Sequence, residues 1–470
     1  MLFNSLTFLV FFAIVFALHG LLRGWTARKR LLLVGSYVFY AAWNPPYVAI
    51  LLFSTAMDWW LARLIWQSDD DRRRKRLLLV SLVCNLSLLG FFKYGDFLLH
   101  NFQALGATIG VVWQPPRWSI VLPIGISFYT FASLSYTIDV YRREVKGDWS
   151  LLDYALFVSF FPHLVAGPIV RARKLLPQIA EPRRATSAQV GWGLVLVVIG
   201  LFAKTVLADS VFAPVVDTVY IDPAQHGAAD TWAAVLGFSG QIYYDFAGYS
   251  LCAIGLALCF GFEFPDNFRF PYAARGFSDF WRRWHVSLSS WLRDYLYIPL
   301  GGNRGGELKT YRNLMLTMLL GGLWHGASWM YVLWGGLHGL WLSLERRFGG
   351  SDTAERREGK PVVVVTLVTF LVVTLTWIPF RAIDAAAVLA VVNGLARFDV
   401  ASTLPAAQLA TCILAMLATV IWQFAMRDRS LEEAFERIGT LPATAAIGAC
   451  LIGLYLCSGG DQRAFIYFQF

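Results

Sequence analysis

Long apolar runs separated by short polar connections dominate this chain. Six of the runs are close to the ~20 residues that a helix needs to cross the hydrocarbon layer of a membrane. Backbone groups in that layer have no water to bond, so runs of this length predict membrane-spanning helices. The six runs cover residues 2–22, 46–66, 77–99, 191–207, 361–380 and 404–426.

The composition agrees with a membrane protein. The chain is 57% hydrophobic and 15% charged, which is more apolar than one soluble core of this size requires. Its formal net charge is +9, and basic residues cluster in loops at 23–30 and 72–76. Under the positive-inside rule these loops face the cytoplasm and the N-terminus lies outside. The charge therefore orients the protein, and no nucleic-acid partner is expected.

These patterns predict an all-α polytopic membrane protein with about ten spans. No internal repeat or long soluble linker divides the sequence, so we expect one domain over residues 1–470, with a catalytic core at approximately 120–345. The six cysteines lie in apolar stretches without Cys-x-x-Cys pairs or histidines at ligand spacing. They predict neither disulfides nor a metal site.

Two apolar stretches have basic residues at both ends, which conflicts with a single crossing. The first, 151–166, predicts a re-entrant or surface-lying segment. The second runs from Lys309 to Arg347 and predicts two short helices that meet near residues 322–326, which would place Trp324 and His325 deep in the membrane. The sequence between them, FSDFWRRWHVSLSSWLRDYLYIPLGGNRGG at 277–306, is too polar to span and suits the cytoplasmic interface.

His325 is the first candidate for chemistry. An ionisable side chain inside a membrane segment is costly and suggests function by default. A neutral histidine near its reference pKa of about 6.5 can act as a general base on a hydroxyl, and the flanking Gly322 and Gly326 leave room for a substrate. The alternative is a buried histidine that is hydrogen-bonded between helices.

His285 is the second candidate. It could orient an acyl donor or assist proton transfer, or it could be an interfacial histidine among aromatic residues. A third, His338, could face the same cavity, but the pattern favours a hydrogen bond that packs two helices together.

Further side chains are candidates for binding substrate or acyl donor. The glycine-rich turn at 301–306 resembles a backbone nest for an anion such as a pyrophosphate, although such loops often only make turns. Asp245 interrupts a long apolar stretch, where it could line a substrate path or pair with a buried arginine. The candidates are Trp281, Trp284, Trp291, Arg293, Asp294, Asn303, Trp324 and Asp245.

Several motifs together resemble a known family. WRRWHVSLSSWLRDYLYIPLGGNRGG is followed by LWHGASW and by the C-terminal FIYFQF. The segments LTFLVFF, SYVFYAAWNP and LPIGISFYTFASLSYTIDVYR also fit. In combination they resemble the bacterial polysaccharide branch of the membrane-bound O-acyltransferase (MBOAT) family, above all its alginate O-acetylating members, over nearly the whole chain.

The resemblance implies a fold and an activity. Re-entrant and interfacial helices would surround a central tunnel, with His325 as the principal catalytic residue and His285 as the upstream histidine. The enzyme would sit in the bacterial inner membrane and hold no permanent cofactor. It would move an acetyl group from cytoplasmic acetyl-CoA toward an extracytoplasmic polysaccharide, alginate foremost, with a periplasmic or extracellular acetyltransferase-type partner.

Two other functions fit the same spans. A transporter or flippase for a lipid-linked sugar would use the intramembrane polar residues to line a path without making a bond. A passive membrane scaffold for a polysaccharide synthase would need no function at the two histidines.

Overall fold

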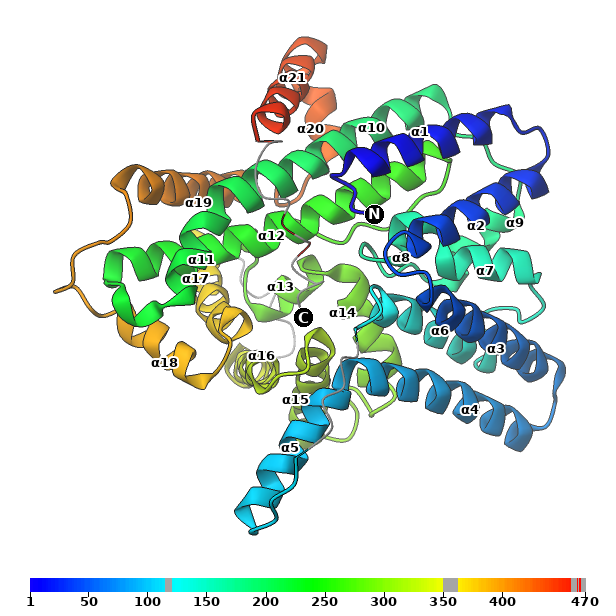
Figure 1. Ribbon diagram of the computed structural model, residues 1–470, viewed down its shortest axis with the longest axis horizontal. Helices are drawn as coiled ribbons and strands as arrows, with labels where there is room; N and C mark the ends of the chain where they lie inside the picture. The colour runs from blue at the N-terminus through cyan, green and yellow to red at the C-terminus, as the bar shows by residue number, and fades with distance from the viewer. Residues whose placement is uncertain (115–120, 350–361, 458–462, 464, 466–470) are drawn as a thin grey trace. The chain divides into compact units, whose positions relative to one another are not determined.

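The computed structural model describes residues 1–114, 121–349, 362–457, 463 and 465, and within them every regular element is helical (Figure 1). The prediction of an all-α chain is thus confirmed. The elements are α1 Leu6–Leu21, α2 Trp25–Ala41, α3 Tyr47–Gln67, α4 Asp71–Leu89, η1 Gly90–Tyr94, α5 Gly95–Thr108, α6 Ile126–Tyr141, α7 Leu151–Ser159, α8 Phe161–Leu164, α9 Ala172–Ala180, α10 Ser187–Phe202, η2 Ala203–Phe212, α11 Ala213–Ile221, η3 Pro223–Gln225, α12 Ala228–Cys259, η4 Pro271–Ala273, α13 Phe277–Arg283, α14 Val286–Leu292, η5 Arg293–Tyr297, α15 Glu307–His325, α16 Trp329–Gly349, α17 Val362–Arg381, α18 Ala385–Gly394, α19 Ala406–Met426, α20 Leu431–Ile438 and α21 Thr440–Cys457.

Seven helices in the described part of the chain are long and apolar enough to cross a membrane. Two are continuous helical runs of several elements, one from α4 through α5 and one from α10 through α11. The predicted first span is realised as the shorter α1, of 16 residues. The count of about ten spans stays a prediction. The seven are Tyr47–Gln67, Asp71–Thr108, Ser187–Ile221, Ala228–Cys259, Val362–Arg381, Ala406–Ala425 and Thr440–Cys457.

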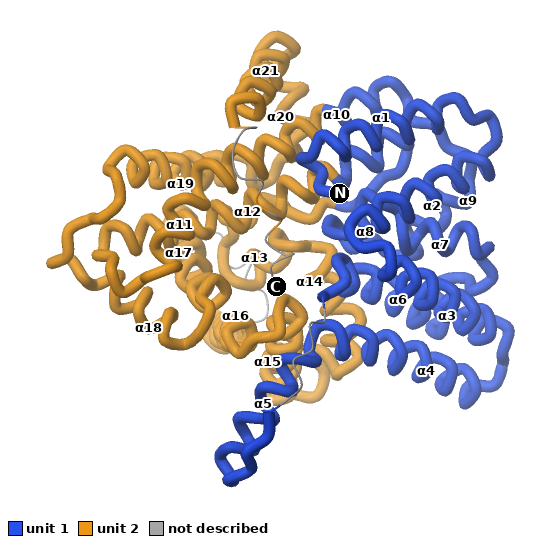
Figure 2. Tube along the Cα trace, viewed as in Figure 1, with its two compact units in different colours: residues 1–194, 253–265 blue, residues 195–252, 266–470 orange. Residues whose placement is uncertain are grey.

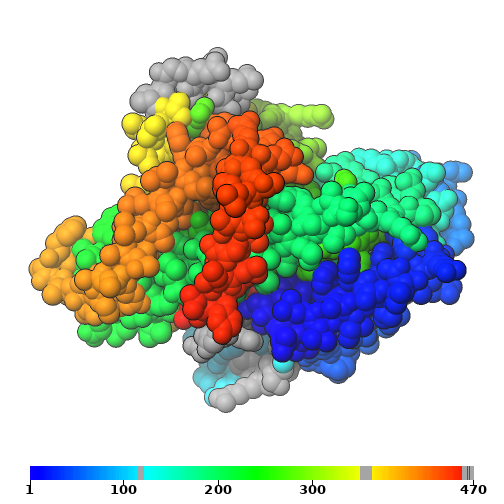
Figure 3. Space-filling model, turned by 90° about the horizontal axis from the view of Figure 1, so that it is seen from above, coloured from blue at the N-terminus to red at the C-terminus, as the bar shows by residue number. Residues whose placement is uncertain are grey.

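The last of these spans shows how the surface is suited to lipid. Helix α21 is red in Figure 3 and lies at the surface, with none of its side chains buried. Leu441 and Tyr455 are 80% and 79% exposed. Apolar side chains that are this exposed would be unfavourable in water, and they are in their favoured solvent when hydrocarbon surrounds them.

Contacts divide the chain into two compact units (Figure 2). Unit 1 comprises Met1–Leu194 and Ala253–Pro265, and unit 2 comprises Val195–Cys252 and Asp266–Phe470. All the candidate site residues fall in unit 2.

Two clusters of buried polar groups in unit 1 are satisfied by partners within the unit. Asp58 of α3 accepts hydrogen bonds from Ser81 Oγ at 2.6 Å and Asn85 Nδ2 at 2.8 Å, both on α4. Lys29 of α2 forms an ion pair with Asp153 of α7. Buried charges are tolerated when they are paired or hydrogen-bonded, so these contacts tie α2 to α7 and α3 to α4.

The segment at 151–166 contains no continuous spanning helix, as predicted. Helix α7 has nine residues and α8 has four, with a break at Phe160. Nine helical residues extend about 14 Å, less than half of the ~30 Å hydrocarbon layer. The segment therefore cannot cross the membrane as one helix.

The stretch from Lys309 to Arg347 corrects one expectation and confirms another. Its helices are not short: α15 has 19 residues and α16 has 21. They can pack closely along their length because a Cβ on Gly322 would lie 2.2 Å from the Tyr331 carbonyl oxygen, and one on Gly335 would lie 2.3 Å from the Met318 carbonyl oxygen. Glycine lets two helix backbones approach in this way. The two helices meet at residues 326–328, so the basic flanks lie at the open end of the hairpin and His325 at the closed end.

The two halves of the polar segment at 277–306 differ in burial. Its first half is interior to unit 2, since Trp284 and His285 are 0% exposed. In its second half the Arg293 side chain is 64% exposed. Aromatic packing and internal ion pairs satisfy the first half inside the protein, and the cytoplasmic interface as the place of the segment stays a prediction.

Candidate active site

His285 sits at a strained turn between α13 and α14. Its backbone has φ 43° and ψ 53°, in the left-handed region that few residues other than glycine adopt. The turn is held from outside, because the Val286 N–H donates to the Asn267 carbonyl oxygen at 2.9 Å. Left-handed residues that cost of order 1–3 kcal/mol gather at functional sites. Here the turn directs the imidazole into the interior.

The His285 ring has two polar neighbours at Nδ1, of which Ser287 Oγ is 3.4 Å away, and it makes two aromatic contacts. Its Nδ1 lies 3.0 Å from Asn267 Oδ1. Phe246 contacts the ring edge-on with centroids 4.5 Å apart, and the Trp324 ring lies at 6.2 Å. Nε2 is buried and has no hydrogen-bond partner within the described part of the chain. His285 lies outside the candidate spans, and burial lowers its pKa to about 3, so the ring is neutral at pH 7.

His325 ends α15 and is surrounded by rings. The side chain is 3% exposed. Trp324 and Trp334 lie with ring centroids 5.1 Å from its own, and Phe380 lies at 5.3 Å. The next residue must be small, since a Cβ on Gly326 would lie 2.1 Å from the Tyr331 ring. The glycine therefore lets the chain turn closely beneath the histidine.

The Trp324 ring lies beside the rings of both His285 and His325. Its ring lies 6.2 Å from that of His285 and 5.1 Å from that of His325. The fold thus brings both predicted histidines to one aromatic residue, which was also a predicted site residue.

His338 is a structural tie. The Trp281 indole N–H donates to its Nδ1 at 3.2 Å, and its Nε2 lies 2.9 Å from Thr376 Oγ1. The Thr376 hydroxyl donates in turn to the Val373 carbonyl oxygen at 2.6 Å. Both ring nitrogens have hydrogen-bond partners, which agrees with the prediction that His338 forms hydrogen bonds between helices. Trp281 was a predicted substrate contact, but its N–H serves this tie.

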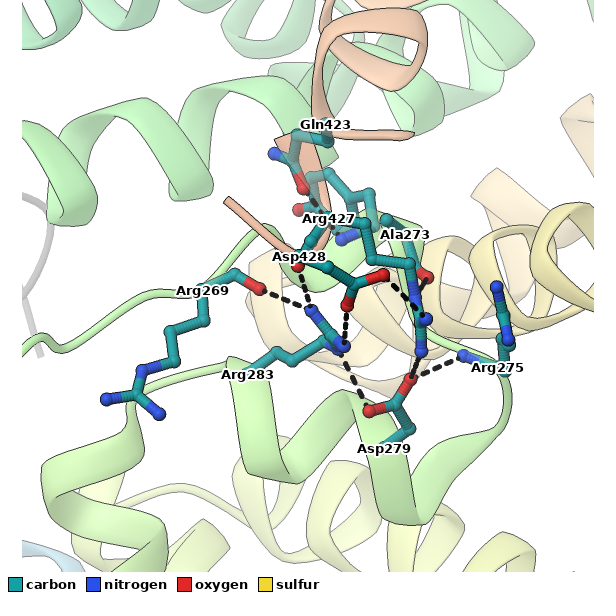
Figure 4. A network of polar contacts seen from close by, with 9 residues as sticks. Arg269, Ala273, Arg275, Asp279, Arg283, Gln423, Arg427 and Asp428 are labelled. Atoms are coloured by element: carbon teal, nitrogen blue, oxygen red, sulfur yellow. Dashed lines mark hydrogen bonds and ion pairs between the residues drawn. The ribbon is translucent and has the colours of Figure 1, made fainter. Parts of the chain in front are cut away.

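An ion-pair network anchors α13, which leads into His285 (Figure 4). Arg283 Nε donates to Asp279 at 2.9 Å, and Arg427, just beyond α19, donates to the other oxygen of that carboxylate at 2.8 Å. Arg427 Nε also reaches the Ala273 carbonyl oxygen at 2.9 Å. Burial raises the pKa of Asp279, but the hydrogen bond from the Arg275 N–H, the Arg283 charge and the side-chain hydrogen bonds from Arg427 and Arg283 outweigh it, so the pKa is lowered overall. The carboxylate stays charged and holds α13 to the end of α19.

The N-terminus of α13 has a separate anchor. Glu345 of α16 accepts hydrogen bonds from the Phe277 N–H at 2.6 Å and the Ser278 N–H at 3.2 Å. A carboxylate satisfies the unpaired N–H groups at the start of a helix and interacts favourably with its dipole. The segment before His285 is thus fixed at both ends.

Trp284 and Asp245 have other partners than predicted. Trp284 packs against Phe268 and Trp377, with ring centroids 5.0 Å away in each case. Asp245 forms an ion pair with Lys204 of η2, so the alternative of a buried arginine named the wrong residue. Both lysine and arginine satisfy a buried carboxylate, and sequence alone does not distinguish them at this distance along the chain.

The remaining candidates lie around η5 and the turn after it. Arg293 pairs with its neighbour Asp294 at 2.7 Å, and Trp291 contacts Tyr295 with centroids 5.0 Å apart. Asn303 accepts from the Tyr297 hydroxyl.

Several N–H groups of the glycine-rich turn donate to carbonyl oxygens close by in the chain. The Gly301 and Gly302 N–H groups donate to carbonyl oxygens of η5 and the residue after it, and the Arg304 N–H donates to Gly301. Those three donors cannot serve an anion, which argues against a nest at these positions.

The sequence reasoning missed four residues that build the site. Asn267 and Phe246 contact His285, and Trp334 and Phe380 contact His325. Only Asn267 left a usable signal, as a polar residue inside the aromatic and proline-rich sequence FPDNFRFPY.

Comparison with known proteins assigns the chain. The family model for MBOAT, the membrane-bound O-acyltransferase family, matches residues 41–349, which include both histidines. The chain belongs to the membrane-bound O-acyltransferase family. It is therefore a multi-pass membrane protein and an O-acyltransferase, and the family assignment displaces the transporter and scaffold alternatives.

The chain is similar to several named acyltransferases. It is 43% identical to the "Probable alginate O-acetylase AlgI" of Pseudomonas aeruginosa over 384 residues, which cover 81% of this chain and 72% of that protein. It is 34% identical to a peptidoglycan O-acetyltransferase of Helicobacter pylori over 94% of this chain and 91% of that protein. It is 28% identical to a teichoic acid D-alanyltransferase of Bacillus subtilis over 48% of this chain and 59% of that protein.

Proposed function

We propose that this O-acyltransferase moves an acetyl group from cytoplasmic acetyl-CoA to hydroxyl groups of an extracytoplasmic polysaccharide, with alginate the first candidate. It works in the bacterial inner membrane, either on the glycan itself or through a periplasmic or extracellular acetyltransferase-type partner that completes the esterification. The observation that carries the proposal is the pair of buried histidines that share Trp324 inside the region matched by the family.

The choice of acceptor follows the relatives. Those matching at 40–43% identity are alginate O-acetylases of several bacteria, and one at 34% acetylates peptidoglycan. All are named for modifying material of the cell envelope. Acetyl-CoA is made in the cytoplasm, so the two substrates approach from opposite faces of the membrane.

The reaction requires one proton to move. His325 accepts the proton of the acceptor hydroxyl while that oxygen attacks the thioester carbonyl carbon. The C–S bond then breaks, the thiolate of coenzyme A leaves, and the imidazolium returns the proton to the sulfur. General base catalysis of this kind contributes about 10² to 10⁴ in rate. Positioning and stabilisation of the oxyanion supply the remainder.

Replacing His325 by Ala tests the proposal. In membranes supplied with labelled acetyl-CoA and polysaccharide, we expect acetyl transfer to fall by about 10² or more. His100→Ala is the matched control, because His100 is exposed on α5 in unit 1. Both variants are compared at equal membrane abundance. Acetylation by His325→Ala at the level of His100→Ala would reject the assignment.

A further inference from the structure

Asn267 makes more contacts with the His285 turn than any other side chain described above. It is 1% exposed and precedes η4. Its Oδ1 lies 3.0 Å from His285 Nδ1 and 2.8 Å from Ser287 Oγ, while its Nδ2 donates to Ser250 Oγ at 3.1 Å. The amide group is therefore used on both sides, with its oxygen toward the histidine.

A contact with a backbone N–H group shows which end of the Asn267 side-chain amide is the oxygen. The Ser287 N–H points at Asn267 Oδ1 at 3.4 Å. A backbone N–H can only donate, so the atom that faces it is the oxygen and not the NH₂ group. The nitrogen of His285 that meets the same oxygen must then also donate. Nδ1 carries the proton, and in the neutral ring Nε2 carries the lone pair.

The protonation of Nδ1 has a consequence for Nε2 of His285. This nitrogen is buried, with no hydrogen-bond partner in the described residues, and an unsatisfied buried acceptor costs ~1–3 kcal/mol. Such a group in a native structure calls for an explanation, and an absent substrate is one. The ring stands between Phe246, which has no hydrogen-bond donor, and Trp324, whose indole N–H does not donate to Nε2.

We propose that Asn267 is a positioning residue that holds His285 as the Nδ1-protonated tautomer, so that Nε2 accepts a hydrogen bond from an O–H or N–H group of a substrate. The inference rests on the proposed function. It narrows the roles open to His285, because a neutral ring in this tautomer cannot donate from Nε2 to the thioester carbonyl oxygen. Nε2 of His285 accepts a hydrogen bond from the substrate, and it does not stabilise the oxyanion.

A structural role for Asn267 is the competing explanation, since it also bonds the start of α14. Two substitutions separate the explanations. Asn267→Asp keeps an acceptor oxygen toward His285, whereas Asn267→Leu keeps a similar volume and removes it. In serine proteases a carboxylate orients the catalytic histidine. When that carboxylate is replaced and the histidine adopts the wrong tautomer, kcat falls by about 10⁴.

We expect Asn267→Leu to lower kcat by about 10² or more and Asn267→Asp to recover most of the loss. KM for acetyl-CoA and KM for the polysaccharide, measured separately on Asn267→Asp and wild type, identify the substrate that reaches Nε2 as the one whose KM changes. Equal kcat and KM values in wild type and Asn267→Leu would overturn the proposal.

The tautomer is read directly by ¹⁵N NMR of the full-length protein labelled at histidine. The His285 signals are assigned by their loss in His285→Gln. We expect the proton on Nδ1 in the wild type and a shift toward Nε2–H in Asn267→Leu. A wild-type His285 protonated at Nε2 overturns the inference even if the Leu variant does not fold. If His285→Gln and His325→Ala both retain acetylation, the proposed function itself fails.

Discussion

His285 and His338 are two buried histidines in unit 2 with different hydrogen bonding. Both are 0% exposed, and both are surrounded by aromatic rings. His338 has a partner at each nitrogen, Trp281 on one side and Thr376 on the other. His285 has a partner at Nδ1, while its Nε2 has none among the described residues.

The comparison shows which property sets these two histidines apart. Residue type, burial and aromatic surroundings are shared, so none of them separates the two. Hydrogen-bond satisfaction does, because a buried polar atom left without a partner is unfavourable unless something else binds it. Each of the following substitutions tests a part of this comparison.

The largest effect on activity is expected from His285→Gln. Glutamine keeps a similar size and polarity but has no basic nitrogen. We expect acetyl transfer to fall by about 10² to 10⁴, with the thermal unfolding midpoint close to wild type because Nε2 makes no bond to the described protein. Transfer assays and a thermal melt in detergent measure the two effects. If His285→Gln transferred acetyl groups as fast as wild type, the unpartnered Nε2 of His285 would not distinguish it from His338.

An intermediate effect is expected from Gly326→Ala. The added Cβ would lie 2.1 Å from the Tyr331 ring, so the ring or the chain beneath His325 must move. Displacement of a catalytic group by about 1 Å can cost about 10² in rate. Gly336→Ala is the control, since its Cβ would meet only Leu319 at an ordinary 3.5 Å. Equal activity of the two variants would show that this close contact does not position His325.

The smallest effect on activity is expected from His338→Ala. The change leaves the Trp281 indole N–H without its partner, while the Thr376 hydroxyl keeps its hydrogen bond to the Val373 carbonyl oxygen, and an unsatisfied buried group costs ~1–3 kcal/mol. We therefore expect a lower unfolding midpoint but transfer within about threefold of wild type per folded molecule. A loss as large as that of His285→Gln, in protein shown to be folded, would place His338 in the chemistry after all.

Sequence patterns predicted several features of this site for reasons that can be named. Basic residues at both ends of the stretch from Lys309 to Arg347 required the chain to return to the same side, and the α15–α16 hairpin does so with His325 at its closed end. The helix lengths within it were wrong. They depend on the close approach at Gly322 and Gly335, which is a contact between two helices and not a property of either.

Partners distant in sequence were the least predictable part. Asp245 was expected to need a cation if it did not line a path, but that the cation is Lys204 depends on how η2 packs against α12. Asn267 carries no charge and lies in none of the motifs named above, so the sequence marks it only as a polar residue among aromatic ones and does not place it beside His285.

By itself the sequence determined that this chain is helical, that it belongs in a membrane, and that a histidine deep in an apolar stretch is costly there, because hydropathy, charge and the cost of desolvation are local properties of residues. Only the tertiary structure decided that His285 and His325 meet at Trp324 and which imidazole nitrogen keeps its lone pair. The physical reason is that a hydrogen bond or a ring contact needs two groups within a few ångströms, and those groups come from separate segments that only folding brings together.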